Sequence, residues 1–113
     1  MRLIPAAALA LSAALALAAP AGAADPMTDL TNLYRITISN DLCDFPLSAA
    51  QSDELTRRTE DLETQLNLSD DASTRMYEQI EAQMTKQVEA GLCKASGEWA
   101  REYARQVESL AAK

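Results

Sequence analysis

Residues 70–93 read DDASTRMYEQIEAQMTKQVEAGLC, and this stretch carries the clearest structural signal in the chain. Apolar side chains recur in it every four residues, at Met76, Ile80, Met84, Val88 and Leu92. That spacing is typical of a helix with one apolar face. Ser69 stands where an N-cap belongs, and the two aspartates that follow suit the positive end of a helix dipole. We therefore predict a helix from residue 70 and expect it to be the central helix of the fold.

Downstream of this stretch, Gly91 weakens the helical pattern, and residues 96–98 (Ser-Gly-Glu) are suited to starting another helix. That segment carries Trp99 and Tyr103 at helical spacing. The four prolines all precede residue 47, so proline forces no break here. Residues 70–111 therefore form either one long helix bent near Gly97 or two separate helices.

Upstream, residues 48–66 predict a helix that begins with a capping box made by Ser48 and Gln51. Most of its positions are charged or polar, and its apolar seam is narrow. The seam consists of Leu55, Leu62 and Leu66, joined by Ala50 and Thr59. Such a helix lies on the outside of a bundle or binds a partner along its seam.

Residues 30–42 allow two interpretations. Leu30, Leu33 and Ile38 fall at helical spacing, with Thr28 or Asp29 as the N-cap. The alternation of apolar and polar residues over 34–38 is instead typical of a strand, because it is rich in β-branched residues. No partner strand is predicted elsewhere, so we favour the helix and place a break at residues 41–46.

The two cysteines, Cys43 and Cys93, are fifty positions apart. In a short exported chain, an even pair of cysteines indicates a disulfide. A zinc site is disfavoured because the chain has no histidine to complete the ligand set. We predict a Cys43–Cys93 disulfide that ties the break after the first helix to the end of the third, with the second and third helices packed antiparallel.

Residues 1–24 have the pattern of a cleaved secretory signal peptide. Arg2 gives a positive start, residues 6–19 are apolar apart from one serine, and residues 21–23 (Ala-Gly-Ala) suit signal peptidase. The apolar run is short and rich in alanine, which disfavours a membrane-spanning helix. We expect cleavage before Ala24 or Asp25 and export, to a periplasm in the first place or to the extracellular space as the alternative. We expect no stable membrane insertion afterwards.

Taken together, these patterns predict an all-α fold: a single domain over residues 25–113, built as a small three- to four-helix bundle with one disulfide. This part of the chain carries all 17 acidic residues and nine of the ten basic ones, a net charge of −8. Such a charge disfavours binding to nucleic acid and to anionic membrane surfaces.

Catalytic and cofactor patterns are lacking in the sequence. Histidine is absent, and the three glycines are too few and too scattered for a phosphate-binding loop. Neighbouring acidic residues on a helix point in different directions, so the carboxylate runs are read as helix caps and solvated faces. We therefore expect no enzyme activity, no metal and no cofactor.

The acidic composition has a consequence at low pH. Between about pH 2 and 3 most carboxylates become protonated, and the net charge changes from −8 to about +9. A helical bundle with acidic faces is expected to loosen under that change, with the disulfide limiting its expansion.

In this respect the chain resembles the periplasmic acid-stress chaperones of the HdeA type. The likeness lies in the signal peptide, the length of the remaining helical chain, the two distant cysteines, Cys43-Asp44-Phe45 and Gly97-Glu98-Trp99. The turn at residues 45–48 and the long third helix differ from that family's pattern. The resemblance implies a holdase that is activated by acid and suppresses the aggregation of client proteins.

Two functions therefore stay open at this point. The first is a non-enzymatic structural or protein-binding module, which would bind a partner through the seam of residues 48–66 or through a surface made by Tyr77, Trp99 and Tyr103. The second is the acid-activated holdase. Neither the partner nor the oligomeric state follows from the sequence.

Overall fold

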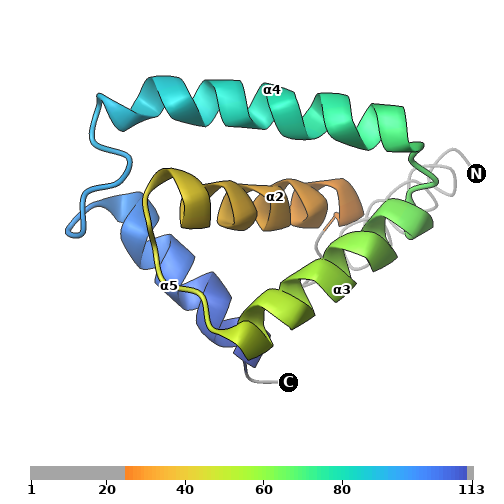
Figure 1. The fold of residues 1–113 in the computed structure, drawn as a ribbon, viewed down its shortest axis with the longest axis horizontal. Helices are drawn as coiled ribbons and strands as arrows, with labels where there is room; N and C mark the ends of the chain where they lie inside the picture. Colours follow the sequence, from red (N-terminus) through yellow and green to blue (C-terminus); the bar gives the residue numbers. More distant parts are fainter. Residues whose placement is uncertain (1–24, 112–113) are drawn as a thin grey trace, which may run out of the picture.

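The computed structural model describes residues 25–111, and over this range the chain is all-helical. The predicted signal peptide, residues 1–24, lies outside the described residues. Four helices follow one another without an intervening strand in the described part (Figure 1): α2 (Pro26–Leu42), α3 (Ala49–Gln65), α4 (Asp70–Val88) and α5 (Glu98–Ala111). The predicted all-α bundle is confirmed, and residues 30–42 are helical.

Side-chain caps fix the start of three of these helices. The Ser48 capping box is present: the Gln51 backbone N–H donates to Ser48 Oγ at 3.1 Å, and the Ser48 N–H donates to Gln51 Oε1 at 2.9 Å. Ser69 caps α4 as predicted. The cap of α2 was predicted too far along the chain, because Asp25 is the N-cap and Pro26 fills the first turn.

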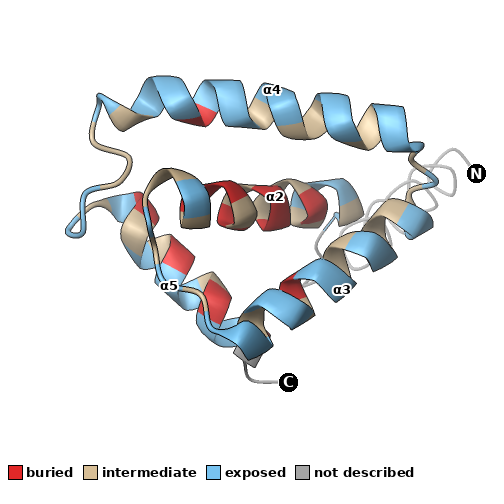
Figure 2. Ribbon diagram, viewed as in Figure 1, coloured by how far each residue is buried: buried red, intermediate tan, exposed pale blue. Residues whose placement is uncertain are grey.

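Helix α2 lies at the centre of the fold, between the other three (Figure 2). Its buried side chains point in several directions around the helix: Leu30, Leu33, Tyr34, Ile36, Ile38 and Ser39. A helix that is apolar on most sides is buried on most sides. The expectation that the helix from residue 70 would be central is therefore wrong.

Helix α4 lies instead along one edge and packs on α2 (Figure 1). Met84 is its single buried residue within the described range. Met76, Ile80 and Val88 are half-buried. Residues four positions apart lie slightly further around the helix at each step, so only part of this apolar seam faces α2. This edge helix therefore contributes little to the core.

The disulfide forms between Cys43 and Cys93, whose Cα atoms are 5.1 Å apart. Helices α2 and α4 run in the same direction, so their carboxyl ends lie at the same end of the molecule (Figure 1). The bond joins the segments that follow those two ends. The pairing was predicted. We expected antiparallel packing of the helix at residues 48–66 on the next helix to bring the cysteines together, but the parallel arrangement of α2 and α4 does so instead.

Residues 89–97 separate α4 from α5, so the stretch from residue 70 onward forms two helices. Gly91 has a φ of 102°, a left-handed value that favours glycine. Helix α5 then turns one apolar face toward the core, with four buried residues: Trp99, Tyr103, Val107 and Leu110.

Candidate functional site

Two of the three residues predicted to form a partner surface belong to the core. Trp99 is 9% exposed and Tyr103 is 3% exposed. The Trp99 Nε1–H donates to Ser39 Oγ at 2.7 Å, and the Tyr103 hydroxyl donates to the Pro46 carbonyl oxygen at 2.9 Å. These aromatic residues anchor α5 to α2 and to the turn after α2, so they are far less exposed than we expected, although Tyr103 also lines the apolar groove described below.

Tyr77, the third residue of that set, lies on α4 and is half-buried. Its ring packs edge-on against Tyr34, with 5.5 Å between the ring centroids. The Tyr34 hydroxyl donates to Glu63 Oε2 on α3. Burial, followed by this hydrogen bond, raises the pKa of Tyr34 to about 12. Tyr77 therefore helps to hold α4 against α2, and it is not next to Trp99 and Tyr103.

The apolar seam of α3 also faces inward. Leu55 is buried, and Leu62 is half-buried and packs against the core. The structure therefore leaves little of this seam for a partner, and the candidate sites are two other depressions in the surface.

The larger depression is an apolar groove of about 760 Å³ between α5 and the segment 45–51. It is lined by Phe45, Pro46 and Leu47 of that segment together with Tyr103 and Val107 of α5. The Phe45 and Tyr103 rings are tilted against each other with centroids 5.0 Å apart. The remaining lining residues are small or polar: Ser48, Gln51, Ala95, Ala100, Ala104 and Glu108.

Local sequence explains why this groove forms. Pro46 keeps the segment between α2 and α3 extended, since proline disfavours helix at the residue before it. The Asn40 side chain donates to the Phe45 carbonyl oxygen at 2.8 Å and holds the segment against the end of α2. Alanines on α5 leave space where larger side chains would fill it. Sequence reasoning placed a break here but did not recognise its apolar residues as a surface.

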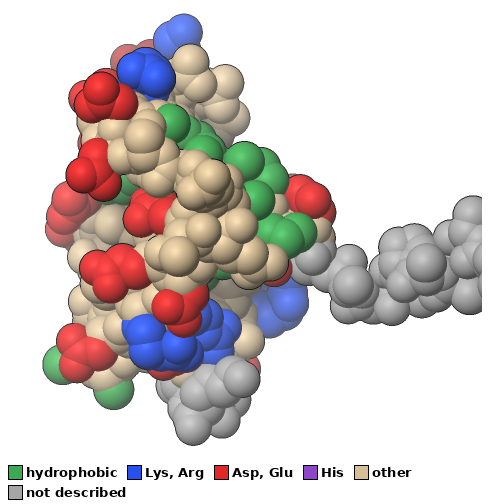
Figure 3. All heavy atoms as spheres, turned by 90° about the vertical axis from the view of Figure 1, so that its right-hand side faces the viewer, with side chains coloured by type: hydrophobic (Ala, Val, Ile, Leu, Met, Phe, Trp, Pro, Cys, Tyr) green, Lys and Arg blue, Asp and Glu red, His purple; other side chains and the backbone are tan. Residues whose placement is uncertain are grey.

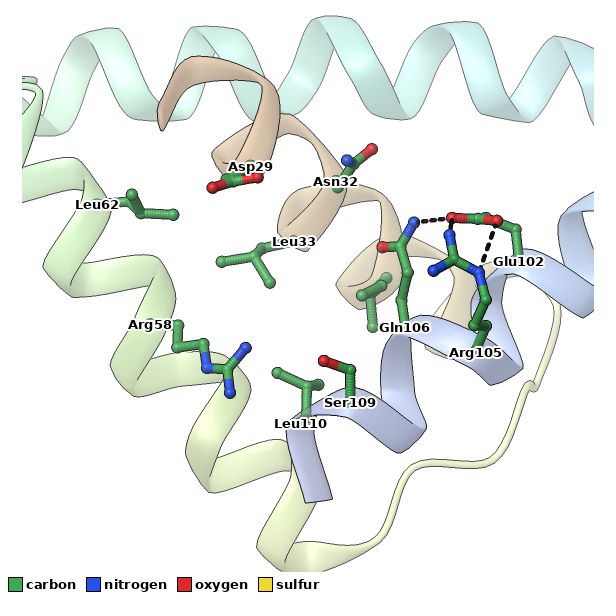
Figure 4. Close-up of a pocket in the computed structure, with 11 residues that line it drawn as sticks. Asp29, Asn32, Leu33, Arg58, Leu62, Glu102, Arg105, Gln106, Ser109 and Leu110 are labelled. Carbon is green, nitrogen blue, oxygen red and sulfur yellow. Dashed lines mark hydrogen bonds and ion pairs between the residues drawn. The ribbon is translucent and has the colours of Figure 1, made fainter. Parts of the chain in front are cut away.

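The second depression, of about 480 Å³, lies between α2, α3 and α5 (Figure 4). Its apolar lining comes from all three helices: Leu33, Ile36, Leu62 and Leu110. Arg58 of α3 extends its guanidinium group toward Ser109 and Leu110 of α5 (Figure 4). We call this depression the Arg58 pocket.

Ion pairs organise the charged groups of this pocket. Arg58 Nε donates to Glu54 Oε2 at 2.8 Å, and Arg57 Nη2 donates to the same oxygen at 2.6 Å. These hydrogen bonds, first that of Arg57 and then that of Arg58, lower the pKa of Glu54 to about 2. Arg58 Nη2 is buried and has no hydrogen-bond partner among residues 25–111.

On the α5 side, Glu102 accepts hydrogen bonds from Gln106, at 2.6 Å, and from Arg105. Both interactions lower the pKa of the Glu102 carboxyl group. Glu102 and Arg105 are thus engaged with each other at the rim. Sequence reasoning missed Arg58 because it lies inside a charged run, although the spacing Glu54, Arg58, Leu62 places these three residues on one helix face.

Acidic side chains outnumber basic ones, in keeping with the composition. Figure 3 shows several of them along one side of the face where α3 ends and α4 begins, beside a hydrophobic patch. In the described part of the chain, no three His, Cys, Asp or Glu residues are grouped so that they could hold a metal ion. No helix between residues 25 and 111 is long and apolar enough to cross a membrane.

Comparison with known proteins gives no family for this chain. No protein-family model matches it, nor does any curated protein or solved structure.

Proposed function

We propose that this is an exported, non-enzymatic protein that binds a segment of another polypeptide in the groove between α5 and residues 45–51. The observation that carries the proposal is the groove itself: about 760 Å³, lined mainly by apolar and small side chains, with Glu108 as its single charged residue. Interfaces between proteins have apolar centres from which charged residues are depleted.

Charge indicates the kind of partner. The groove contains one acidic residue and no basic one. Residues 25–113 carry a net charge of −8, which attracts a cationic partner and repels an acidic one. An amphipathic helix with an apolar face and basic flanks therefore fits best, and the alanines of α5 allow its backbone to approach closely.

Export is supported by two independent features. Residues 1–24 have the signal-peptide pattern, and the Cys43–Cys93 disulfide is consistent with an exported protein because such bonds persist in oxidising compartments. The periplasm is the simplest destination for a leader of this kind.

A designed peptide tests the proposal. A fluorescent helical peptide of leucine and lysine, with leucines on one face, should bind the protein, and a matched leucine–glutamate peptide should not. Ala104→Arg places a bulky cation in the groove and should abolish binding measured by anisotropy. Ala82→Arg makes the same change at an exposed alanine of α4 and should leave binding intact. Equal binding by both variants would refute the groove as the binding site.

The acid-activated holdase is the second candidate, and one observation favours it. Helix α4 buries a single side chain on α2 but is held to it by the disulfide, so it is the element best suited to open without leaving the molecule. At pH 2 to 3, where the charge inverts, the protein should suppress light scattering by an aggregating client. Undiminished scattering at equimolar protein would rule out this function.

A further inference from the structure

We propose that the Arg58 pocket binds a monocarboxylate with an aliphatic chain, and that Arg58 holds its carboxylate. This site is separate from the groove of the proposed function, since the two share no lining residue. Three observations lead to the ligand: a buried donor without an acceptor, four apolar residues in the lining, and an acidic group that disfavours negative charge away from Arg58.

The donor is Arg58 Nη2. It is buried, and residues 25–111 offer it no acceptor, while the Nε of the same guanidinium group is bonded to Glu54. A buried N–H without a partner is costly, so an acceptor supplied by a ligand gains more here than on the open surface. Glu54 also serves Arg57, so its charge is shared between two guanidinium groups. A carboxylate is the group that guanidinium binds most specifically.

The apolar lining indicates what the carboxylate is attached to. The apolar part of the lining consists of Leu33 and Ile36 of α2, Leu62 of α3 and Leu110 of α5. The volume of about 480 Å³ lies within the range usual for small-molecule sites. An aliphatic chain of medium length suits this size and lining.

The other charged groups limit the ligand to one negative charge. Asp29 lines the pocket at the first turn of α2 and is half-buried, so a negative charge next to it is repelled, whereas one next to Arg58 is attracted. Glu102 and Arg105 are paired with each other at the rim. Ser109 of α5 also lines the pocket and adds a hydroxyl donor (Figure 4).

Decanoate is the probe for this site. The full chain is expressed with its leader, purified after export and titrated with decanoate while backbone amide shifts are recorded by NMR. We expect saturable shifts at pocket positions on α2, α3 and α5 and none at Phe45 and Leu47. Decanol, which lacks the charge, and acetate, which lacks the chain, should each bind at least tenfold more weakly.

Two variants separate Arg58 from a general effect of charge. Arg58→Met keeps the apolar stem and should raise the Kd for decanoate about tenfold, equivalent to about 1.4 kcal/mol. Arg57→Met removes the same charge one residue away, at a side chain outside the pocket, and should change Kd less than twofold. Glu54 keeps one arginine partner in either variant.

A third variant covers the case in which Arg58→Met does not fold. Ser109→Phe fills the pocket from an exposed position and retains Arg58, so it should block decanoate while leaving the thermal midpoint unchanged. The proposal is overturned if the native protein does not bind decanoate at millimolar concentration. It is equally overturned if Arg57→Met weakens binding as much as Arg58→Met, or if Ser109→Phe binds normally.

Discussion

Replacing both cysteines, as Cys43→Ser with Cys93→Ser, should lower the free energy of unfolding by about 4 kcal/mol. The bond closes a loop across a sequence separation of 50 residues. The chain-entropy relation for a loop of that length gives about 4 kcal/mol at 25 °C. Small domains have a net stability of about 5–15 kcal/mol, so the variant loses a large share of it.

The structure also predicts where the loss is felt first. Helix α4 has one buried residue, Met84, whereas α2 is buried on several sides. Without the disulfide, the carboxyl end of α4 is no longer tied to the end of α2. Amide hydrogens of α4 should therefore exchange faster under native conditions, while those of α2 keep their protection.

Urea unfolding followed by circular dichroism measures the first effect, and hydrogen exchange followed by NMR measures the second. Native protein treated with a thiol reductant is the matched control and should behave as the double variant does. A loss of less than about 1 kcal/mol would refute the loop-closure reasoning. Equal loss of protection in α2 and α4 would show that α4 does not open separately.

Four further changes test the packing and the charged groups. Met84→Ala should cost about 2–5 kcal/mol in urea unfolding, because the side chain is 2% exposed, and a cost below 1 kcal/mol would mean that α4 is not docked. Ser39→Ala leaves the buried Trp99 N–H without an acceptor and should cost about 1–3 kcal/mol, whereas the same change in a Trp99→Phe background should cost clearly less. The pKa of Glu54 is lowered to about 2, so its stabilising contribution is complete above pH 4.5 and is lost as pH falls toward 2. Glu54→Gln should therefore flatten the curve of stability against pH between pH 4.5 and 2. An unchanged slope would contradict the ion pair. The pKa of Tyr34 is raised to about 12, so stability should fall as pH rises from 10 toward 12, and Tyr34→Phe should reduce that fall in alkaline denaturation.

Local patterns in the sequence were sufficient to locate most helix boundaries. Ser48 and Ser69 cap the helices that they were expected to cap, because a capping residue acts on its own first turn and needs no tertiary partner. The disulfide was predictable from the cysteine count and spacing. Residues 30–42 were harder, because the alternation of Tyr34, Ile36 and Ile38 resembles a strand.

That alternation has a physical explanation in the fold. Side chains two positions apart point to nearly opposite sides of a helix. Tyr34 contacts α4, whereas Ile36 lines the Arg58 pocket beside α3 and α5. A pattern typical of a strand here reports a helix buried on two sides. The regular apolar seam from Met76 to Val88 led us to predict a central helix, which was wrong. Regular spacing shows that a helix has an apolar face, but it does not show how much of that face other helices cover.

The candidate sites depend on contacts between distant segments, and the sequence did not reveal them. The groove combines residues 45–51 with α5, and the Arg58 pocket combines three helices. Trp99 and Tyr103 were assigned to the surface because exposed aromatic residues often bind partners. Instead, Trp99 donates a hydrogen bond to Ser39, and Tyr103 donates one to the Pro46 carbonyl oxygen. Both acceptors are more than fifty residues away in the chain.

The Cys43–Cys93 bond also gives the molecule the covalent form of a ring with two arms. Helices α3 and α4 lie within the ring, and α2 and α5 extend from it. A protease that cuts once between residues 43 and 93 opens the ring but releases no fragment, so all four helices stay in one molecule. A cut in either arm, by contrast, detaches core residues that the ring cannot retain. The turn between α3 and α4 is therefore a place where one cut leaves the molecule in one piece, whereas a cut at residues 94–97, outside the ring, separates α5 from it.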